Sequence, residues 1–330
     1  MKKRLKSLVQ ADLFSVIAPI VVLSLALSLS TKGFLSQYNI YSNFQQVAIY
    51  TVVGLAQMMV LSLGQMNLAV GSVGCLSTMI FGMTMQNLGM PAVVCMLLTC
   101  VTGVILGGIQ GLLVTKTRIN PFIISLSLLS IYKGFALVIT KGVPYSELQE
   151  GFKALGSLKI LSLPASFYAA LVLCILVFIL IRYRKLGKKL LACGANRTAA
   201  IYSGINYTKV VITGHCLSGL LCSLAAILQI SRFGSAQMSI GDDWMMTSFV
   251  VPVLGGTLLS GGKVNVFGVM FGAVLMTIIQ NSIVLWKFSP HASQLVLGLI
   301  LLLAYEVDRM RRNMMKRQST TAALKKEAEK

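Results

Sequence analysis

The sequence predicts an all-α, polytopic membrane protein with about ten transmembrane helices, one or two of them short or broken. Two observations predict this fold: the composition, and the regular spacing of apolar stretches along the chain. Of the 330 residues, 56% are hydrophobic and only 12% are charged, and the mean hydropathy is +0.80. Soluble proteins carry about 25% charged residues, so lipid must surround much of this chain.

Ten apolar stretches approach the length of about 20 helical residues that crosses roughly 30 Å of hydrocarbon. In chain order they cover residues 13–30, 44–63, 68–86, 91–114, 120–140, 164–181, 208–230, 244–259, 264–285 and 291–306. The third and the eighth are the weakest, and we predict that these two are short or broken helices.

The basic residues predict the orientation of the spans, because cytosolic connections carry an excess of Lys and Arg. With the N-terminus in the cytosol, 22 of the 29 Lys and Arg residues fall on the cytosolic side and seven on the outer side. An odd number of spans would place one basic terminus outside. We therefore predict that both termini are cytosolic, with a tail at residues 1–12, a transmembrane domain at 13–306 and a basic tail at 307–330.

Residues 182–206 form the most unusual connection between two spans. They carry six Lys and Arg residues and no acidic residue, which predicts a cytosolic location. The connection is longer than a tether, and it contains the small-residue sequences Gly-Ala-Asn, Ala-Ala and Ser-Gly-Ile. We predict that it docks on a cytosolic partner. The alternative is a solvated basic loop that only sets the topology.

The sequence gives no sign of a catalytic, nucleotide-binding or metal site. The net charge of +20 would suit nucleic acid, but the basic residues lie between apolar stretches, so topology explains them better. A phosphate-binding loop within residues 255–268 would need glycine in place of Thr257 and a hydroxyl in place of Val264. The seven cysteines form no CxxC pair, and His215 and His291 lack matching ligands. We predict no cofactor and no enzymatic activity.

Polar side chains within the predicted spans must face protein or water rather than lipid. Most are neutral, which suits a hydroxylated and uncharged ligand. No row of intramembrane carboxylates is present to relay protons or bind sodium, which argues against an ion-coupled transporter. Polarity, span placement and the motifs described below give these candidate substrate-pathway residues: Gln57, Gln65, Asn67, Asn120, Phe122, Tyr132, Lys133, Gln280 and Asn281. For Lys133, the alternative is an amine that simply reaches the outer surface.

Two glycine-rich stretches interrupt the apolar pattern, at residues 64–74 (GQMNLAVGSVG) and 255–268 (GGTLLSGGKVNVFG). Broken helices at membrane depth often line a substrate path, which would give these stretches a pathway or gating role. The alternative is close helix packing through small residues.

Four motifs in order resemble one family of membrane proteins. They are VLSLGQMNLAVGS at 60–72, INPFIISL at 119–126 with Tyr132-Lys133-Gly134 after it, GANRTAAIYSGIN at 194–206, and LGGTLLSGGK at 254–263. The chain resembles, from about residue 43 to 305, the permease subunit of bacterial ATP-binding-cassette importers of the ribose type. That family also includes xylose, galactoside, autoinducer-2 and nucleoside permeases.

The resemblance implies a permease subunit in the bacterial inner membrane that forms the path for a ribose-type monosaccharide and has no catalytic residues. It implies a second permease subunit, a cytosolic ATPase, an extracytoplasmic substrate-binding protein and surrounding lipid as partners, and no nucleic acid. Residues 182–207 would be the coupling loop to the ATPase, with Asn196 capping a short helix. The expected coupling residues are Gly194, Asn196, Arg197, Ala199, Ala200, Ser203 and Gly204.

Several positions depart from the family pattern. Asn67 stands where Asp is usual and Gln65 where Gly is usual, and Lys133 replaces an Arg and loses its bidentate geometry. Met245 and Thr247 stand where acidic residues are common. These changes leave open the sugar and the choice between homodimer and heterodimer. Uptake of a nucleoside or autoinducer-2 is the alternative within the family, and a self-standing channel or membrane enzyme is the alternative outside it.

Overall fold

The computed structural model describes residues 2–288 except Lys32 and Arg118, together with five single positions between 295 and 306. Side chains are described from Val16 onward. Apart from those single positions, the predicted span at 291–306 and the predicted tail at 307–330 lie outside the described residues.

Helices make up almost all of the regular structure in the described part of the chain. They are α1 (Lys2–Ser30), α2 (Gln37–Leu61), α3 (Val70–Gln86), α4 (Ala92–Lys116), α5 (Pro121–Thr140), α6 (Glu150–Ser157), α7 (Ala165–Tyr183), α8 (Lys185–Ala195), α9 (Arg197–Tyr202), α10 (Tyr207–Phe233), α11 (Trp244–Leu254) and α12 (Val266–Leu285). A short antiparallel ribbon joins β1 (Lys159–Ile160) to β2 (Leu163–Pro164). The predicted helical class is therefore confirmed for these residues, with this small ribbon as an addition.

Six helices are long and apolar enough to cross a membrane: α2, α4, α5, α7, α10 and α12. They coincide with the second, fourth, fifth, sixth, seventh and ninth predicted spans. The first predicted span corresponds to the shorter apolar part of α1 at Val16–Ser30. The chain is thus a multi-pass membrane protein, while the count of ten spans stays a prediction.

The third and eighth predicted spans are the short helices α3, of 17 residues, and α11, of 11 residues. A non-helical segment at residues 62–69 precedes α3, and another at 255–265 follows α11. We call them the first break and the second break. Gly64 in the first break has a φ of +71°, and Gly261 and Gly262 in the second have φ of +85° and +76°. Only glycine adopts such backbone angles without steric cost, so the sequence itself favours these non-helical segments.

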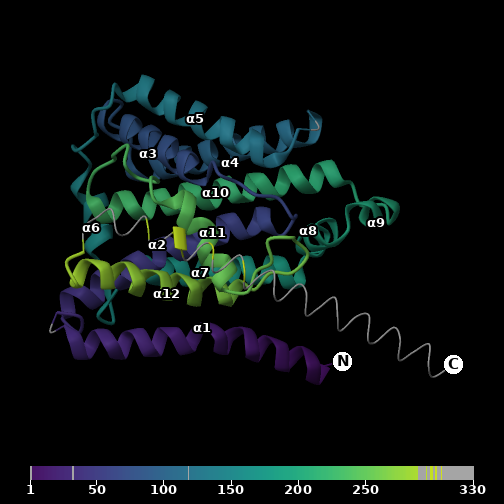
Figure 1. Ribbon diagram of the computed structural model, residues 1–330. Coiled ribbons are helices and arrows are strands. Elements are labelled where there is room, and N and C mark those ends of the chain that lie inside the picture. The colour runs from purple at the N-terminus through teal and green to yellow at the C-terminus, as the bar shows by residue number, and fades with distance from the viewer. Residues whose placement is uncertain are drawn as a thin grey trace.

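The helices lie side by side, with α6 at one end of the bundle and α8 and α9 at the other (Figure 1). The N-terminal end of α1 lies toward the α8–α9 end. The predicted placement of the N-terminus and the 182–207 connection on one side of the membrane agrees with this arrangement. The assignment of that side to the cytosol stays a prediction.

The core forms around α2, whose residues from Val47 to Leu61 are all buried. Next to it, α10 packs closely along α4 through glycines. A Cβ on Gly103 would touch the carbonyl oxygen of Gly219, and a Cβ on Gly107 would touch that of His215. Small-residue packing therefore joins these two helices, away from the two glycine-rich stretches for which the sequence suggested it.

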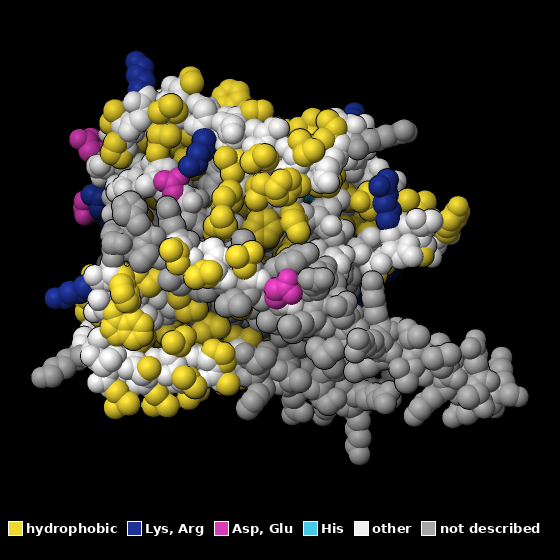
Figure 2. Space-filling model, in the orientation of Figure 1, with side chains coloured by type: hydrophobic (Ala, Val, Ile, Leu, Met, Phe, Trp, Pro, Cys, Tyr) yellow, Lys and Arg dark blue, Asp and Glu magenta, His cyan; other side chains and the backbone are white. Residues whose placement is uncertain are grey.

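The outward faces of the helices are apolar. Leu97, Val101 and Ile105 follow one another at four-residue spacing on α4 and are 62%, 53% and 54% exposed. Figure 2 shows hydrophobic side chains over much of one face of the molecule, with Lys and Arg side chains mostly toward its two ends. Such a surface suits hydrocarbon between two polar boundaries.

Candidate functional site

Three of the buried amide side chains at the first break form hydrogen bonds within it, and we call them the amide cluster: Gln57, Asn67 and Gln110. The Gln57 amide, oriented to satisfy both partners, donates to the main-chain oxygen of Asn67 at 3.0 Å and accepts from its N–H at 3.2 Å. The side-chain oxygen of Asn67 accepts from the Ala69 N–H at 2.8 Å and from Gln110 Nε2 at 3.0 Å. The cluster thus supplies partners for main-chain groups that leave the helix in an apolar environment.

Two buried polar side-chain atoms near the first break have no hydrogen-bond partner among the described residues. They are Oε1 of Gln110 and Nδ1 of His215. Such orphaned groups are uncommon in buried positions and indicate a place for water or for a ligand hydroxyl.

A pocket of about 620 Å³ opens at the α8–α9 end, and we call it the inner pocket. The first break, the turn between α4 and α5, and the segment from α9 to α10 form its walls. Gln65, Asn120 and Arg197 all line it, although they are far apart in sequence. Two of these were predicted as pathway residues and the third as a coupling residue.

A chain of contacts connects α9 with the first break across the inner pocket. The guanidinium carbon of Arg197 lies 4.4 Å from the centre of the Tyr207 ring, a cation–π contact. The Tyr207 hydroxyl accepts a hydrogen bond of 3.2 Å from Gln65 Nε2. Oε1 of Gln65 in turn lies 2.9 Å from Nε2 of the buried His215.

The other pathway candidates on α5 have mostly local partners. Asn120 caps α5, because its side-chain oxygen accepts from the Phe122 N–H at 2.9 Å. Phe122 is 43% exposed on the outward face. The buried Tyr132 donates its hydroxyl to the Leu106 carbonyl oxygen on α4 at 2.9 Å.

Lys133 forms an ion pair with Asp242, in the connection before α11, at 2.5 Å. The two side chains are 43% and 54% exposed. The amine therefore has a carboxylate partner within the chain, on the side of α5 that faces the α10–α11 connection. A half-exposed pair of this kind stabilises a fold only slightly.

The remaining candidates, Gln280 and Asn281 on α12, face α2 near the α6 end. The Tyr50 hydroxyl contacts Oε1 of Gln280 and lies 2.8 Å from Oδ2 of Asp243. Asn281 and Asn39 exchange two side-chain hydrogen bonds, of 2.8 and 3.2 Å. The pathway candidates thus fall into an inner group, near the first break, and an outer group, near the α6 end.

The 182–207 connection folds into two helices, α8 and α9, that meet at Asn196. Its side-chain oxygen accepts from the Ala199 N–H at 3.0 Å, so the predicted cap is present. At the other end of α9, Ser203 Oγ donates to the Ala199 carbonyl oxygen at 2.9 Å, and Gly204 takes a φ of +79°. Ala200 is buried while Ala199 and Ser203 are exposed.

The most prominent side chains of α9 were not among the predicted residues. Tyr202 is 88% exposed and Ile201 is 47% exposed, at the end of the bundle. The available signal was an aromatic and a branched apolar residue inside an otherwise polar connection. Exposed apolar groups of this kind, surrounded by polar residues, are typical of contact surfaces.

Three chain segments meet backbone to backbone beside α8, and we call this contact the glycine junction: Ser62, Gly64, Gly194, Gly261 and Gly262. The Gly262 N–H donates to the Ser62 carbonyl oxygen at 3.2 Å. A Cβ on Gly194 would touch that same oxygen and would lie 2.8 Å from the nitrogen of Gly262. A Cβ on Gly261 would lie 2.7 Å from the Cα of Gly64. The end of α8 therefore contacts both breaks with no side chain between them.

The comparison with known families decides the class of the protein. Residues 39–305 match the family described as branched-chain amino acid transport system / permease component. The chain belongs to this permease family. As a permease component it is a membrane-embedded transport subunit and not an enzyme, which confirms two of the predictions made from the sequence.

Individual relatives of the permease carry sugar names. This chain is 31% identical over 291 residues to the ribose import permease protein of Bacillus subtilis, and the match covers 87% of this chain and 90% of the relative. It is 28% identical over 302 residues to that of Escherichia coli K12, covering 89% and 92%. It is 30% identical over 299 residues to the L-arabinose ABC transporter permease protein of Azospirillum brasilense, covering 89% and 86%. No solved structure gives a significant match. The resemblance drawn from four motifs is thereby confirmed.

Proposed function

We propose that the permease forms, with a second permease subunit, the membrane path for a ribose-type monosaccharide. An extracytoplasmic binding protein delivers the sugar at the α6 end, and a cytosolic ATPase docks at the α8–α9 end. Relatives named for ribose and L-arabinose, both five-carbon sugars, support this substrate class over the amino acids of the family description. In this proposal residues 13–306 are the permease domain and residues 182–207 its coupling loop.

The chemistry near the first break supports a neutral, hydroxyl-rich substrate. Gln57, Gln65 and Asn67 are neutral amides, and the unpartnered atoms of Gln110 and His215 offer further hydrogen-bonding sites. Hydroxyl groups both donate and accept, so they match a lining of this kind better than an anion or a cation would. We propose that these residues line the part of the path that leads into the inner pocket, where Asn120 marks the exit.

The observation that carries the coupling role is the position of α8 and α9 between a free surface and the breaks. On the surface that faces away from the bundle, α9 presents Tyr202 to solvent. On the surface that packs against the bundle, Gly194 touches both breaks, and Arg197 is connected to Gln65 through Tyr207. A movement of an ATPase bound at Tyr202 would therefore reach the path through short contacts and not through a long flexible loop.

Transport by the reconstituted complex tests this proposal. The permease is placed in proteoliposomes with its ATPase and binding protein, and accumulation of radiolabelled ribose is followed with and without ATP. We expect ATP-dependent uptake, abolished by Tyr202→Asp and retained by Tyr202→Phe, because only the first variant places a charge in the docking surface.

The same assay separates the alternatives. Ribose flux that needs no ATP would indicate a channel and would overturn the proposal. Displacement of labelled ribose by unlabelled L-arabinose supports a sugar path. Uptake of a labelled nucleoside or of autoinducer-2, with none of ribose, would reassign the substrate within the family.

A further inference from the structure

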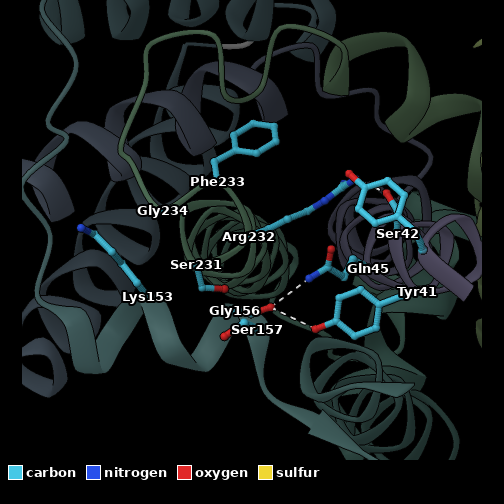
Figure 3. A pocket seen from close by; sticks show the side chains of 11 residues that line it. Tyr41, Ser42, Gln45, Lys153, Gly156, Ser157, Ser231, Arg232, Phe233 and Gly234 are labelled. Atoms are coloured by element: carbon cyan, nitrogen blue, oxygen red, sulfur yellow. Dashed lines mark hydrogen bonds between the residues drawn. The ribbon is translucent and has the colours of Figure 1, made fainter. Parts of the chain in front are cut away.

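A second hollow, of about 490 Å³, lies at the α6 end and takes no part in the transport proposal. It is bounded by the first turns of α2 and by the C-terminal ends of α6 and α10 (Figure 3). We call it the outer hollow. Its wall is fixed, because Gln45 Nε2 and the Tyr41 hydroxyl both donate to the carbonyl oxygen of Gly156, at 2.9 and 3.4 Å.

The charge in the outer hollow comes from one guanidinium group. Arg232, the penultimate residue of α10, extends toward α2 in Figure 3, where Nη2 donates to Ser42 Oγ at 3.1 Å and Nη1 donates to Oε1 of Gln46. Both partners are neutral. The other lining cation, Lys153, points away from Gly156 and pairs with Glu150 at 2.9 Å.

No acidic side chain is hydrogen-bonded to Arg232 in the described part of the chain, and Asp243 interacts with it through charge alone. Asp242 pairs with Lys133 and Glu150 pairs with Lys153, and no carboxylate lines the outer hollow. A guanidinium has five N–H donors, so two hydrogen bonds leave donors for a ligand. Since no carboxylate occupies these remaining donors, an anion in the hollow can accept from them, and a phosphate oxygen pair fits the forked geometry of the guanidinium.

The depth of the outer hollow indicates where such a phosphate comes from. The transmembrane helix α2 begins at Gln37 and α10 ends at Phe233, so the hollow lies level with the end of the apolar bundle. Tyr38, 83% exposed, and Phe233, 48% exposed, flank it. Tyrosine side chains concentrate at the headgroup level of a bilayer. Phospholipid phosphates lie at the same level.

We propose that the outer hollow binds a phosphate group, supplied by the headgroup of an anionic phospholipid such as phosphatidylglycerol. The phosphate oxygens accept from Arg232 and from the hydroxyl groups of the lining, and the acyl chains lie against the apolar outward surface of the bundle. Because the lipid would touch α2, α6 and α10 together, it would stabilise the packing of α6 on the bundle. This site is independent of the transported solute.

Native mass spectrometry of the detergent-purified permease tests the site. The protein is titrated with phosphatidylglycerol, with diacylglycerol as a lipid that lacks phosphate, and with inorganic phosphate. We expect one saturable phosphatidylglycerol site, no saturable diacylglycerol site and a rise in thermal stability with phosphatidylglycerol. Saturable binding of inorganic phosphate at equal affinity would identify a free anion as the ligand and overturn the lipid assignment.

Arg232→Lys is the decisive variant, because it keeps a positive charge and loses the forked donor geometry of the guanidinium. We expect about tenfold weaker phosphatidylglycerol binding than in the unmodified protein. Lys153→Gln, in the same hollow but turned away, and Arg197→Lys, at the other end of the bundle, are the matched controls and should bind as before. If Arg232→Lys does not fold, Ser42→Ala tests the same wall and should also weaken binding. Equal binding by the Arg232 or Ser42 variant and the controls would contradict the proposal.

Discussion

Single amide side chains stabilise the irregular parts of this bundle. Gln57 pairs with both main-chain groups of Asn67, and the side chain of Asn67 pairs with Ala69 and Gln110. In a bilayer, a main-chain group without a partner costs several kcal/mol, because no water is available to replace it. A first break at this depth is therefore possible only because these amides lie around it. Their polarity was visible in the sequence, but the main-chain partners were not, since those depend on where the helix ends.

Gln57→Leu should destabilise the permease, because it removes the partners of the Asn67 N–H and carbonyl oxygen. We expect a loss of about 1–3 kcal/mol in the free energy of unfolding, seen as a lower melting temperature in detergent. Gln37→Leu, the same change at an exposed position on the same helix, is the control and should melt with the unmodified protein. Equal melting of both variants would show that the Gln57 pairing contributes nothing.

Cys193, in α8 and outside the spans, should react slowly with thiol reagents. Its side chain is buried, and burial raises the pKa of the thiol. A raised pKa means less reactive thiolate at neutral pH, so alkylation should be slow at pH 7 and faster as the pH increases. Peptide mass spectrometry after iodoacetamide treatment measures the rate. A Ser203→Cys variant supplies an exposed thiol in the same connection for comparison. Equal alkylation rates at the two positions would show that α8 does not stay packed against the bundle.

At the scale of whole elements, α8 and the two breaks behave as one unit. Both glycine-rich stretches are visible in the sequence, which allows either a gating role or close packing for them. The structure shows close packing at the glycine junction, and it adds a partner that was predicted only as a coupling residue, Gly194. Segments separated by so many residues meet only in the folded chain, so spacing in the sequence carries no sign of this contact.

Gly194→Ala should impair ATP-driven uptake while leaving ATPase binding intact. The added Cβ would touch the Ser62 carbonyl oxygen, so either α8 or the first break must move, at a cost of about 1–3 kcal/mol. We expect the variant to copurify with the ATPase through the unchanged surface of α9, and to lose most ATP-driven uptake. Gly134→Ala on α5 is the matched control, because a Cβ there meets nothing within 4 Å. Full uptake by the Gly194 variant would exclude the glycine junction from coupling.

For the molecule as a whole, the apolar composition predicted more than polarity within the spans did. Apolar length found α4, α5, α7, α10 and α12 to within three residues at each end, and it found α2 except for its first seven residues, since hydrocarbon thickness sets a minimum length for each. Small folded pieces outside the membrane were missed, namely α6 and the ribbon from β1 to β2, because eight or fewer residues carry too little periodicity. The candidate site was predicted only by residue type. Whether Gln65 meets Asn120 or Gln280 depends on how the helices pack, which the sequence does not encode locally.

Two equally exposed positions allow the orientation of the bundle in the membrane to be tested. Leu161 lies in the connection between β1 and β2 and Tyr202 lies on α9, and each is 88% exposed. Since α7 is the one span between them, Leu161→Cys and Tyr202→Cys must place their thiols on opposite sides of the membrane. The excess of basic residues around α8 predicts that Tyr202 is the cytosolic one.

In intact cells, with the native cysteines replaced, a membrane-impermeant maleimide should label the Leu161→Cys variant alone. The Tyr202→Cys variant should become labelled only after permeabilisation. The reverse pattern would invert the molecule and move the ATPase-docking role away from α9, because the ATPase is cytosolic. Labelling of both variants in intact cells would show that α7 does not cross the membrane.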